Sequence, residues 1–220
     1  MKNHKFTIVS LLLFVIVPTF HSCFGNKSDY DEQKKKEQDS IWNECIQRAP
    51  ESFFDTKFGL YREDLIKNFN KNGLTESRQM VTTPNEEISF LGNEENPISY
   101  WGIEWGRVRV SFNDNRFDGI TFITSTGKTY QAYKTLNDLK KVLSDKNITI
   151  ETNNHFTPEG DIDITEYYGS SSWLDYNIKF NYKRLESDED DDDSIYYVIE
   201  LNIKILYDES YNPIPYLTMD

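Results

Sequence analysis

The stretch from Ser194 to Tyr207, SIYYVIELNIKILY, has the strongest periodicity in the chain. Every second residue is apolar or aromatic, which is the period of a β-strand whose side chains alternate between the two faces of a sheet. The residues that would share one face are Ile195, Tyr197, Ile199, Leu201, Ile203, Ile205 and Tyr207. A strand with such a face requires a packed layer against it, so this stretch predicts a sheet that is covered on that side.

Other segments predict antiparallel partners for this strand. In chain order, the further strands that we expect are residues 88–91, 107–112, 119–124, 162–168 and 175–184. Between the second and third of these, Asn113-Asp114-Asn115-Arg116 has the composition of a turn, which indicates a hairpin. Residues 153–160 contain Pro158 and Gly160 and predict irregular structure, with His155 on a surface loop.

Three segments have the spacing of amphipathic helices. We expect helices at residues 34–48 and 62–72, and a third that begins at Thr135-Leu136-Asn137-Asp138, because this tetrapeptide resembles a capping box. The apolar positions of the three helices are Ile41, Trp42, Cys45 and Ile46, then Leu65, Ile66 and Phe69, and then Leu136, Leu139, Val142 and Leu143.

A helix, an aromatic tripeptide ending in glycine and a long hairpin follow one another twice in the sequence. The tripeptides are Tyr100-Trp101-Gly102 and Tyr167-Tyr168-Gly169. We therefore expect an α+β fold with two similar halves, each with a helix packed on an antiparallel sheet. The expected organisation is a signal peptide at 1–22, a tether at 23–37, a first half at 38–130, a second half at 131–207 and a C-terminal tail at 208–220.

The order of these elements resembles that of one known group of proteins. The segment Gly59–Leu65 has the form Gly-Leu-x-x-x-Asp-Leu at the expected start of a helix. This start and the loosely repeated helix and sheet are similar to the beta-lactamase-inhibitor-protein and BamE-like lipoprotein group, in which Ser or Thr commonly stands where this chain has Tyr61. The resemblance implies a tandem fold and assigns no functional residue.

The amino-terminal segment predicts a location. Basic residues precede an apolar run from Ile8 to Val17, which is the layout of a bacterial secretion signal. About ten apolar residues are too few for a permanent span, which needs about twenty. The end of this segment, Phe20-His21-Ser22-Cys23, resembles the lipobox of bacterial lipoproteins, which implies that Cys23 is the lipidation site. An ordinary cleaved signal with an incidental cysteine is the alternative.

Charge and composition support an envelope location and argue against nucleic acid as a partner. The chain has 24 basic and 37 acidic residues and a formal net charge of −13, which repels phosphate backbones. The polar residues after Cys23 are typical of a solvated tether, and residues 28–32 resemble the acidic tract of surface-exported lipoproteins. We expect a lipid-anchored protein of the bacterial outer membrane, on its surface or its periplasmic face.

Side chains with catalytic or metal-binding chemistry are few. Once the signal is removed, His155 is the single histidine, and Cys45, which we expect to be a small buried residue, has no partner if Cys23 is acylated. These counts argue against Ser-His-Asp, Cys-His and His- or Cys-rich metal sites. The acidic run at 187–193 lacks the glycine and final acid of an EF-hand loop, so we interpret it as a solvated hairpin loop. We expect no metal and no cofactor.

Five aromatic residues remain as binding candidates: Trp101, Trp105, Tyr167, Tyr168 and Trp173. On a surface they would stack on sugar rings or form a hot spot for a protein, whereas core packing is the simpler interpretation for most of them. Our leading hypothesis is a non-catalytic binding or scaffold module for a protein partner. A glycan-binding surface lipoprotein and a hydrolase built on carboxylates alone are the alternatives.

Overall fold

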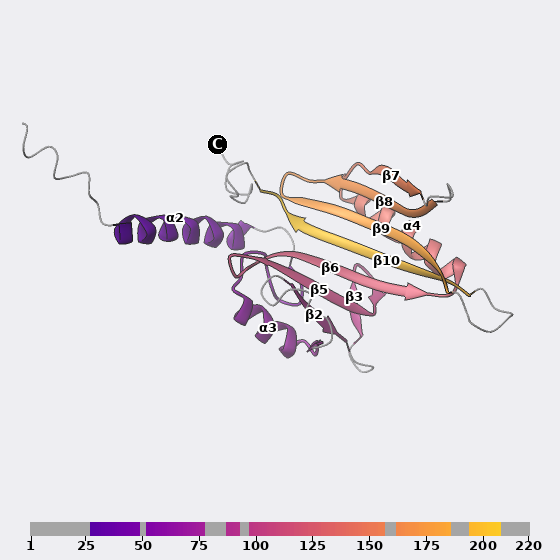
Figure 1. Cartoon of the computed structure of the whole chain (residues 1–220), viewed down its shortest axis with the longest axis horizontal. Coiled ribbons are helices and arrows are strands. Elements are labelled where there is room, and N and C mark those ends of the chain that lie inside the picture. Colours follow the sequence, from indigo (N-terminus) through magenta and orange to yellow (C-terminus); the bar gives the residue numbers. More distant parts are fainter. Residues whose placement is uncertain are drawn as a thin grey trace, which may run out of the picture. The chain divides into compact units, whose positions relative to one another are not determined.

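The structure, a computed structural model, describes residues 27–48, 52–77, 87–92, 97–156, 162–185 and 194–207. The expected signal peptide with Cys23, the acidic run and the C-terminal tail lie outside these residues. Within them the fold is mixed α+β, which confirms the predicted class (Figure 1).

Three helices and ten strands make up the described part of the chain. The helices are α2 (Lys27–Arg48), α3 (Arg62–Lys71) and α4 (Thr129–Asp145). The strands are β1 (Thr75–Glu76), β2 (Glu87–Leu91), β3 (Ile98–Tyr100), β4 (Ile103–Trp105), β5 (Arg107–Asn113), β6 (Arg116–Thr126), β7 (Glu151–Phe156), β8 (Ile162–Ser170), β9 (Leu174–Leu185) and β10 (Ser194–Ile205). The chain divides into two compact units, Met1–Ser40 and Ile41–Asp220, so every strand, α3 and α4 belong to the second unit.

Eight of the strands form one antiparallel sheet in the order β1-β2-β5-β6-β10-β9-β8-β7, and β3 pairs separately with β4. The strand at Ser194 that the sequence predicts most strongly is β10, and it occupies an interior position between β6 and β9. The other predicted strands are also present, as β2, β5, β6, β8 and β9. Both edges of β10 are therefore paired, which places this strand in the interior of the sheet.

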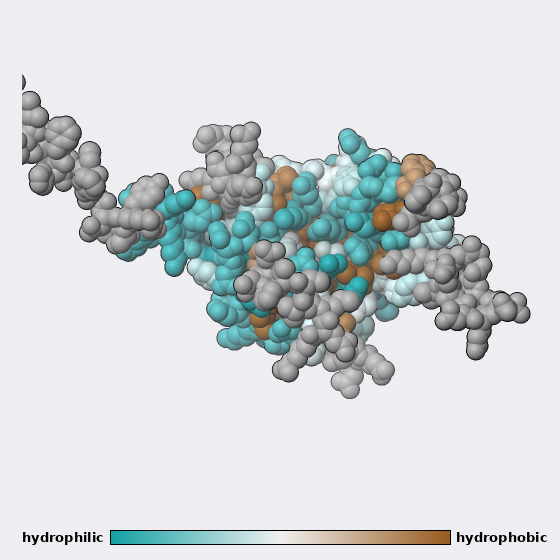
Figure 2. Space-filling model, viewed as in Figure 1, coloured by the Kyte–Doolittle hydropathy of each residue, from teal (hydrophilic) through white to brown (hydrophobic). Residues whose placement is uncertain are grey.

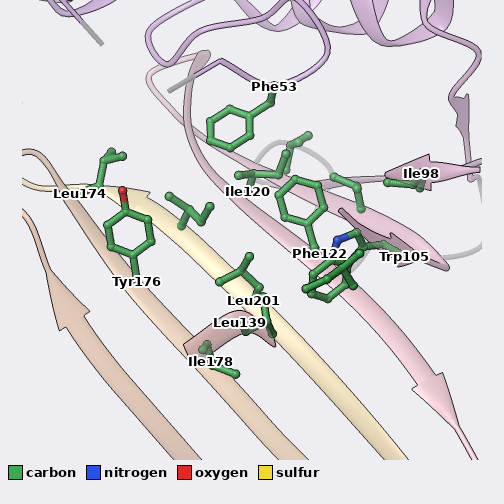
Figure 3. Packing of buried hydrophobic residues seen from close by; sticks show 14 of the residues in the cluster. Phe53, Ile98, Trp105, Ile120, Phe122, Leu139, Leu174, Tyr176, Ile178 and Leu201 are labelled. Atoms are coloured by element: carbon green, nitrogen blue, oxygen red, sulfur yellow. The ribbon is translucent and has the colours of Figure 1, made fainter. Parts of the chain in front are cut away.

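One face of the sheet carries the hydrophobic core. Among the described residues of β10, Tyr197, Ile199, Leu201, Ile203 and Ile205 are at most 8% exposed, which confirms the predicted alternation. Helix α4 packs against this face with its buried Ala132, Leu136, Leu139 and Leu143. Figure 3 shows Leu139 of α4 beside Leu201 of β10 and Ile178 of β9. Burial of one leucine side chain is worth roughly 2 kcal/mol, so this layer is a major source of stability.

An aromatic cluster fills the other part of the core. The ring of Phe122 on β6 is parallel to that of Tyr100 at 4.4 Å between centroids, and its centroid lies 5.5 Å from that of Trp105 and 6.2 Å from that of Phe53. The β3–β4 hairpin supplies Tyr100 and Trp105, so this hairpin lies over the core face of the large sheet (Figure 3).

Two helices begin earlier than the sequence predicts. Helix α4 starts at Thr129, so Thr135 lies inside the helix and the predicted capping box is wrong. The physical reason is Ala132, which is fully buried and extends the Leu136 stripe by one turn toward the N-terminus. Helix α2 starts at Lys27 instead of residue 34 and thus includes residues assigned to the tether. Its exposed turns carry an i,i+4 ion pair between Lys36 and Glu32 at 2.7 Å.

A strand replaces part of the predicted irregular stretch. Residues Glu151–Phe156 form β7, which pairs with β8 at the edge of the sheet. All six residues of β7 are exposed, so the segment has no apolar alternation that could predict a strand. His155 therefore lies on a strand and not on a loop, which corrects the interpretation of this residue.

The two aromatic-glycine tripeptides occupy unlike positions. Trp101 and Gly102 have positive φ values of 55° and 73° and form the tight turn between β3 and β4. Gly169 instead lies within β8, where a Cβ would come 2.4 Å from Ile148 Cγ2 and 2.8 Å from the Thr149 carbonyl oxygen. The first glycine permits a turn and the second permits close approach of a neighbouring segment, so their similarity is one of sequence and not of structure.

None of the helices in the described part of the chain combines the length and the apolar composition that a membrane crossing requires.

Candidate functional site

The eight-stranded sheet has a second face that no described helix covers, and we call it the open face. Helix α4 lies on the core face, where Lys140 Nζ is 3.7 Å from the ring centroid of Tyr167, and α3 packs there through Phe69 against Phe90. Side chains that alternate with core residues form the open face, among them Glu87, Arg107, Arg109, Ser111, Thr121, Ser125, Glu166, Tyr168, Lys179, Tyr196, Glu200, Asn202 and Lys204. In Figure 1, α4 lies behind the sheet, and Figure 2 shows the near side as mainly hydrophilic with small hydrophobic patches.

A buried carboxylate organises one end of the open face. Glu166 on β8 is 8% exposed and accepts hydrogen bonds from three directions. His155 Nε2 on β7 lies 2.7 Å from Oε2, Lys179 Nζ on β9 lies 3.0 Å from Oε1, and the Tyr168 hydroxyl donates to Oε2. The partners come from three adjacent strands, so the contacts tie the edge strand to the interior of the sheet.

These contacts change the pKa values of Glu166 and Tyr168. Burial alone would raise the pKa of Glu166, but the hydrogen bonds from Tyr168, His155 and Lys179, together with the positive charge of Lys179, lower it to about 2. The hydrogen bond to that carboxylate raises the pKa of the Tyr168 phenol, and burial adds to this rise. At neutral pH the site therefore holds a permanent carboxylate and a neutral phenol.

A second buried carboxylate organises the part of the open face on β5 and β6. Asp118 is 3% exposed, and its Oδ1 accepts a hydrogen bond of 2.7 Å from the Ser111 hydroxyl. Its Oδ2 accepts a hydrogen bond of 3.2 Å from the Tyr207 hydroxyl and lies 3.6 Å from Lys204 Nζ. A β-bulge between Ser111 and Phe112 shifts the register beside this group.

Further polar pairs lie on the open face, and some aromatic surface remains exposed. Arg109 Nη1 lies 3.5 Å from Glu87 Oε2, and the Tyr196 hydroxyl donates to Ser125 Oγ at 2.6 Å. Tyr196 and Tyr168 are 36% and 38% exposed. The open face thus combines side chains held by neighbours with rings that still contact solvent.

The five predicted binding aromatics do not meet on one exposed surface. Trp105 is 4% exposed, and its Nε1 donates to the Tyr100 carbonyl oxygen at 3.2 Å. Trp101 and Trp173 are half-buried against the core, and Trp101 stacks on Tyr100 at 4.9 Å between ring centroids. The neighbours in sequence also separate: Tyr167 lies under α4 on the core face, while Tyr168 is on the open face in the Glu166 network.

The sequence did not identify Glu166 or His155 as site residues. The sequence does predict one part of the site. Glu166 and Tyr168 are two positions apart on a predicted strand, so their side chains must lie on the same face of the sheet. The pairing of Glu166 with His155 could not be predicted, because the sequence does not predict that residues 151–156 form a strand.

The lowered pKa of Glu166 differs from that of the general acid in a carboxylate hydrolase. A general acid of that kind needs a raised pKa, whereas the pKa of Glu166 is lowered. Among the residues that the structure describes, no group of three or more His, Cys, Asp or Glu side chains could hold a metal ion.

Comparisons of the chain with protein-family models, with curated proteins and with solved structures find no match.

Proposed function

We propose that this chain is a lipid-anchored protein of the bacterial envelope whose open sheet face binds a protein partner without catalysis. The observation that carries the proposal is the open face, where two buried carboxylates fix surrounding donors while tyrosine rings remain exposed. An antiparallel sheet with one solvated face is common, so openness by itself would not suffice.

The fixed side chains supply the additional argument. Binding usually orders flexible side chains, at about 0.5 to 1.5 kcal/mol for each one immobilised. On the open face, Lys179, Tyr168 and Tyr196 already have partners before any ligand arrives. Binding of a partner therefore loses less side-chain entropy here than it would on a surface whose lysine and tyrosine side chains were unconstrained.

The distribution of charge favours a protein over a polyanion. Basic and acidic residues face each other across neighbouring strands, as Lys179 does with Glu166 and Glu200. Such a surface has no single sign, which suits the mixed charges of a protein surface, and tyrosine is a residue type enriched at binding hot spots.

Photo-crosslinking tests the binding face. A photoreactive phenylalanine at the exposed Asn202 of β10 should give one discrete adduct in intact cells, and Tyr168→Ala should weaken it. The matched control places the same group at Lys141, which is exposed on α4. Equal adducts from both positions, or none from Asn202, would refute the proposal.

The anchor is an independent part of the proposal and rests on the sequence around Cys23. Cys23→Ser removes the sulfur that would carry the lipid. The protein should then move from the membrane fraction to the soluble fraction and change its electrophoretic mobility, because stable attachment needs two or more acyl chains. An unchanged distribution would remove the anchor while leaving the binding face untouched.

We also infer that the sheet consists of two related units. The sets α3-β1-β2-β5-β6 and α4-β7-β8-β9-β10 each contain a helix followed by four sheet strands, and their last strands, β6 and β10, pair in the middle. The β3–β4 hairpin is then an insertion in the first unit. Fragments 38–127 and 128–207, which each contain one unit, should reassemble into a complex when they are co-expressed. Two soluble fragments that do not associate would contradict this inference.

A further inference from the structure

A hollow lies on the helix-covered side of the sheet, away from the open face. It has a volume of about 470 Å³ and lies between the first turns of α4, the β3–β4 turn and the end of β6. Ile199, which is fully buried, and Ile103 supply apolar lining. A hollow of this size accommodates a small ligand or one or two rings of a larger one.

The charged groups at the hollow balance one another. The lining contains two basic side chains, Lys128 and Lys134, and two acidic ones, Glu104 and Asp138. Lys134 Nζ lies 2.7 Å from Asp138 Oδ2, so this pair is already neutralised. A site without net charge gives no electrostatic preference for phosphate, nucleotide or an acidic ligand.

Hydrogen-bonding groups and an exposed ring complete the lining. Gln131 contributes an amide that can both donate and accept, and Thr124 contributes a hydroxyl. Tyr130 is 81% exposed, the highest value among the exposed large hydrophobic residues of the described part of the chain. Its ring is therefore accessible to a ligand that enters the hollow, and stacking would remove apolar ring surface from water.

From this combination we propose that the hollow binds a neutral oligosaccharide. The apolar C–H face of a pyranose ring would stack on Tyr130, while its hydroxyl groups exchange hydrogen bonds with Gln131 and the Lys134–Asp138 pair. This site goes beyond the proposed function, because the four side chains that would hold the sugar (Tyr130, Gln131, Lys134 and Asp138) belong to α4 and not to the open face.

Titration of the purified full chain with neutral oligosaccharides tests the site. The probes are hexasaccharides of β-1,4-glucose, α-1,4-glucose, β-1,3-glucose, β-1,4-xylose and β-1,4-N-acetylglucosamine, with a heparin hexasaccharide as the charged comparison. At least one neutral probe should bind, as measured by calorimetry, and Tyr130→Ala should weaken binding by about tenfold, the scale of one aromatic contact. Because Tyr130 is so exposed, this variant should remain folded.

Two further variants, one control on the open face and one in the lining of the hollow, separate this site from the proposed open-face function. Tyr168→Ala should retain the affinity for the sugar, because Tyr168 lies on the opposite face, whereas Gln131→Ala should reduce it. Absence of binding to every neutral probe, binding to the heparin fragment alone, or an unchanged affinity in Tyr130→Ala would each overturn the proposal. None of these results would affect the crosslinking test of the open face.

Discussion

His155 Nε2 lies 2.7 Å from Glu166 Oε2, although the two residues belong to different strands and are separated by 11 positions in sequence. The contact joins the exposed edge strand β7 to a carboxylate that is almost fully buried on β8. A single acid thus holds together the edge strand, its neighbour and, through Lys179, the next strand. Removing that acid should affect both the stability of this edge and the pKa of Tyr168.

Glu166→Gln should lower the pKa of Tyr168 toward the ordinary value of a tyrosine, because the carboxylate that holds the phenol proton is lost. The measurement is an NMR titration of the Tyr168 ring. Glu200→Gln, an amide substitution on the same face of the sheet, is the control and should leave the Tyr168 titration unchanged. An unaltered Tyr168 titration in Glu166→Gln would contradict the hydrogen bond.

The same carboxylate predicts a dependence of stability on acid. The pKa of Glu166 is about 2 in the folded chain against an ordinary value of 4.5, so its contribution is complete above pH 4.5 and is lost as the pH falls toward 2. The free energy of unfolding should therefore fall more for the wild type than for Glu166→Gln across this window. Urea denaturation at several pH values measures the difference, which at neutral pH should be about 1 to 3 kcal/mol.

Gly169→Ala should destabilise the fold by about 1 to 3 kcal/mol, because the added Cβ would overlap Ile148 and the Thr149 backbone. Gly106→Ala is the matched control. Its added Cβ would lie 3.6 Å from the Ile123 carbonyl oxygen, which is an ordinary contact, so its effect should be much smaller. Equal losses of stability in thermal or chemical denaturation would show that β8 and the Ile148 segment are not closely packed.

Phe122→Ala should lower the free energy of unfolding by about 3 to 5 kcal/mol, because Phe122 is fully buried among Tyr100, Trp105 and Phe53. Tyr196→Ala removes an aromatic ring of comparable size from the open face and should be considerably less destabilising. Chemical denaturation distinguishes the two, and similar values would place the aromatic cluster outside the stabilising core.

The fold could be predicted where burial leaves a periodic pattern. Strand β10 alternates along its length because its core face is packed, and the same pattern predicted β5 from Val108 and Val110. Strand β7 could not be predicted, because all of its side chains are exposed and its sequence follows no hydrophobic period. The start of α4 was missed because it depends on the burial of Ala132, which the capping-box pattern at Thr135 obscured.

The candidate site was less predictable than the fold. Aromatic content correctly indicated residues important for packing, but it did not show which side of the sheet each ring faces. Tyr167 and Tyr168 illustrate this, since adjacent strand residues must lie on opposite faces. The Glu166 network depends on the register between three strands, and register is determined by tertiary pairing, which the sequence of one strand does not contain.

The central pairing of β6 with β10 has a consequence for how the chain acquires its structure. Ile120 lies opposite Ile203, so the long β6 edge stays unpaired until β10 has been synthesised. An exposed apolar edge of this kind invites pairing with other nascent chains, and non-local pairing is slow. The molecule should therefore depend on chaperone protection until β10 has emerged, and truncation before β10 should yield aggregates instead of a folded product.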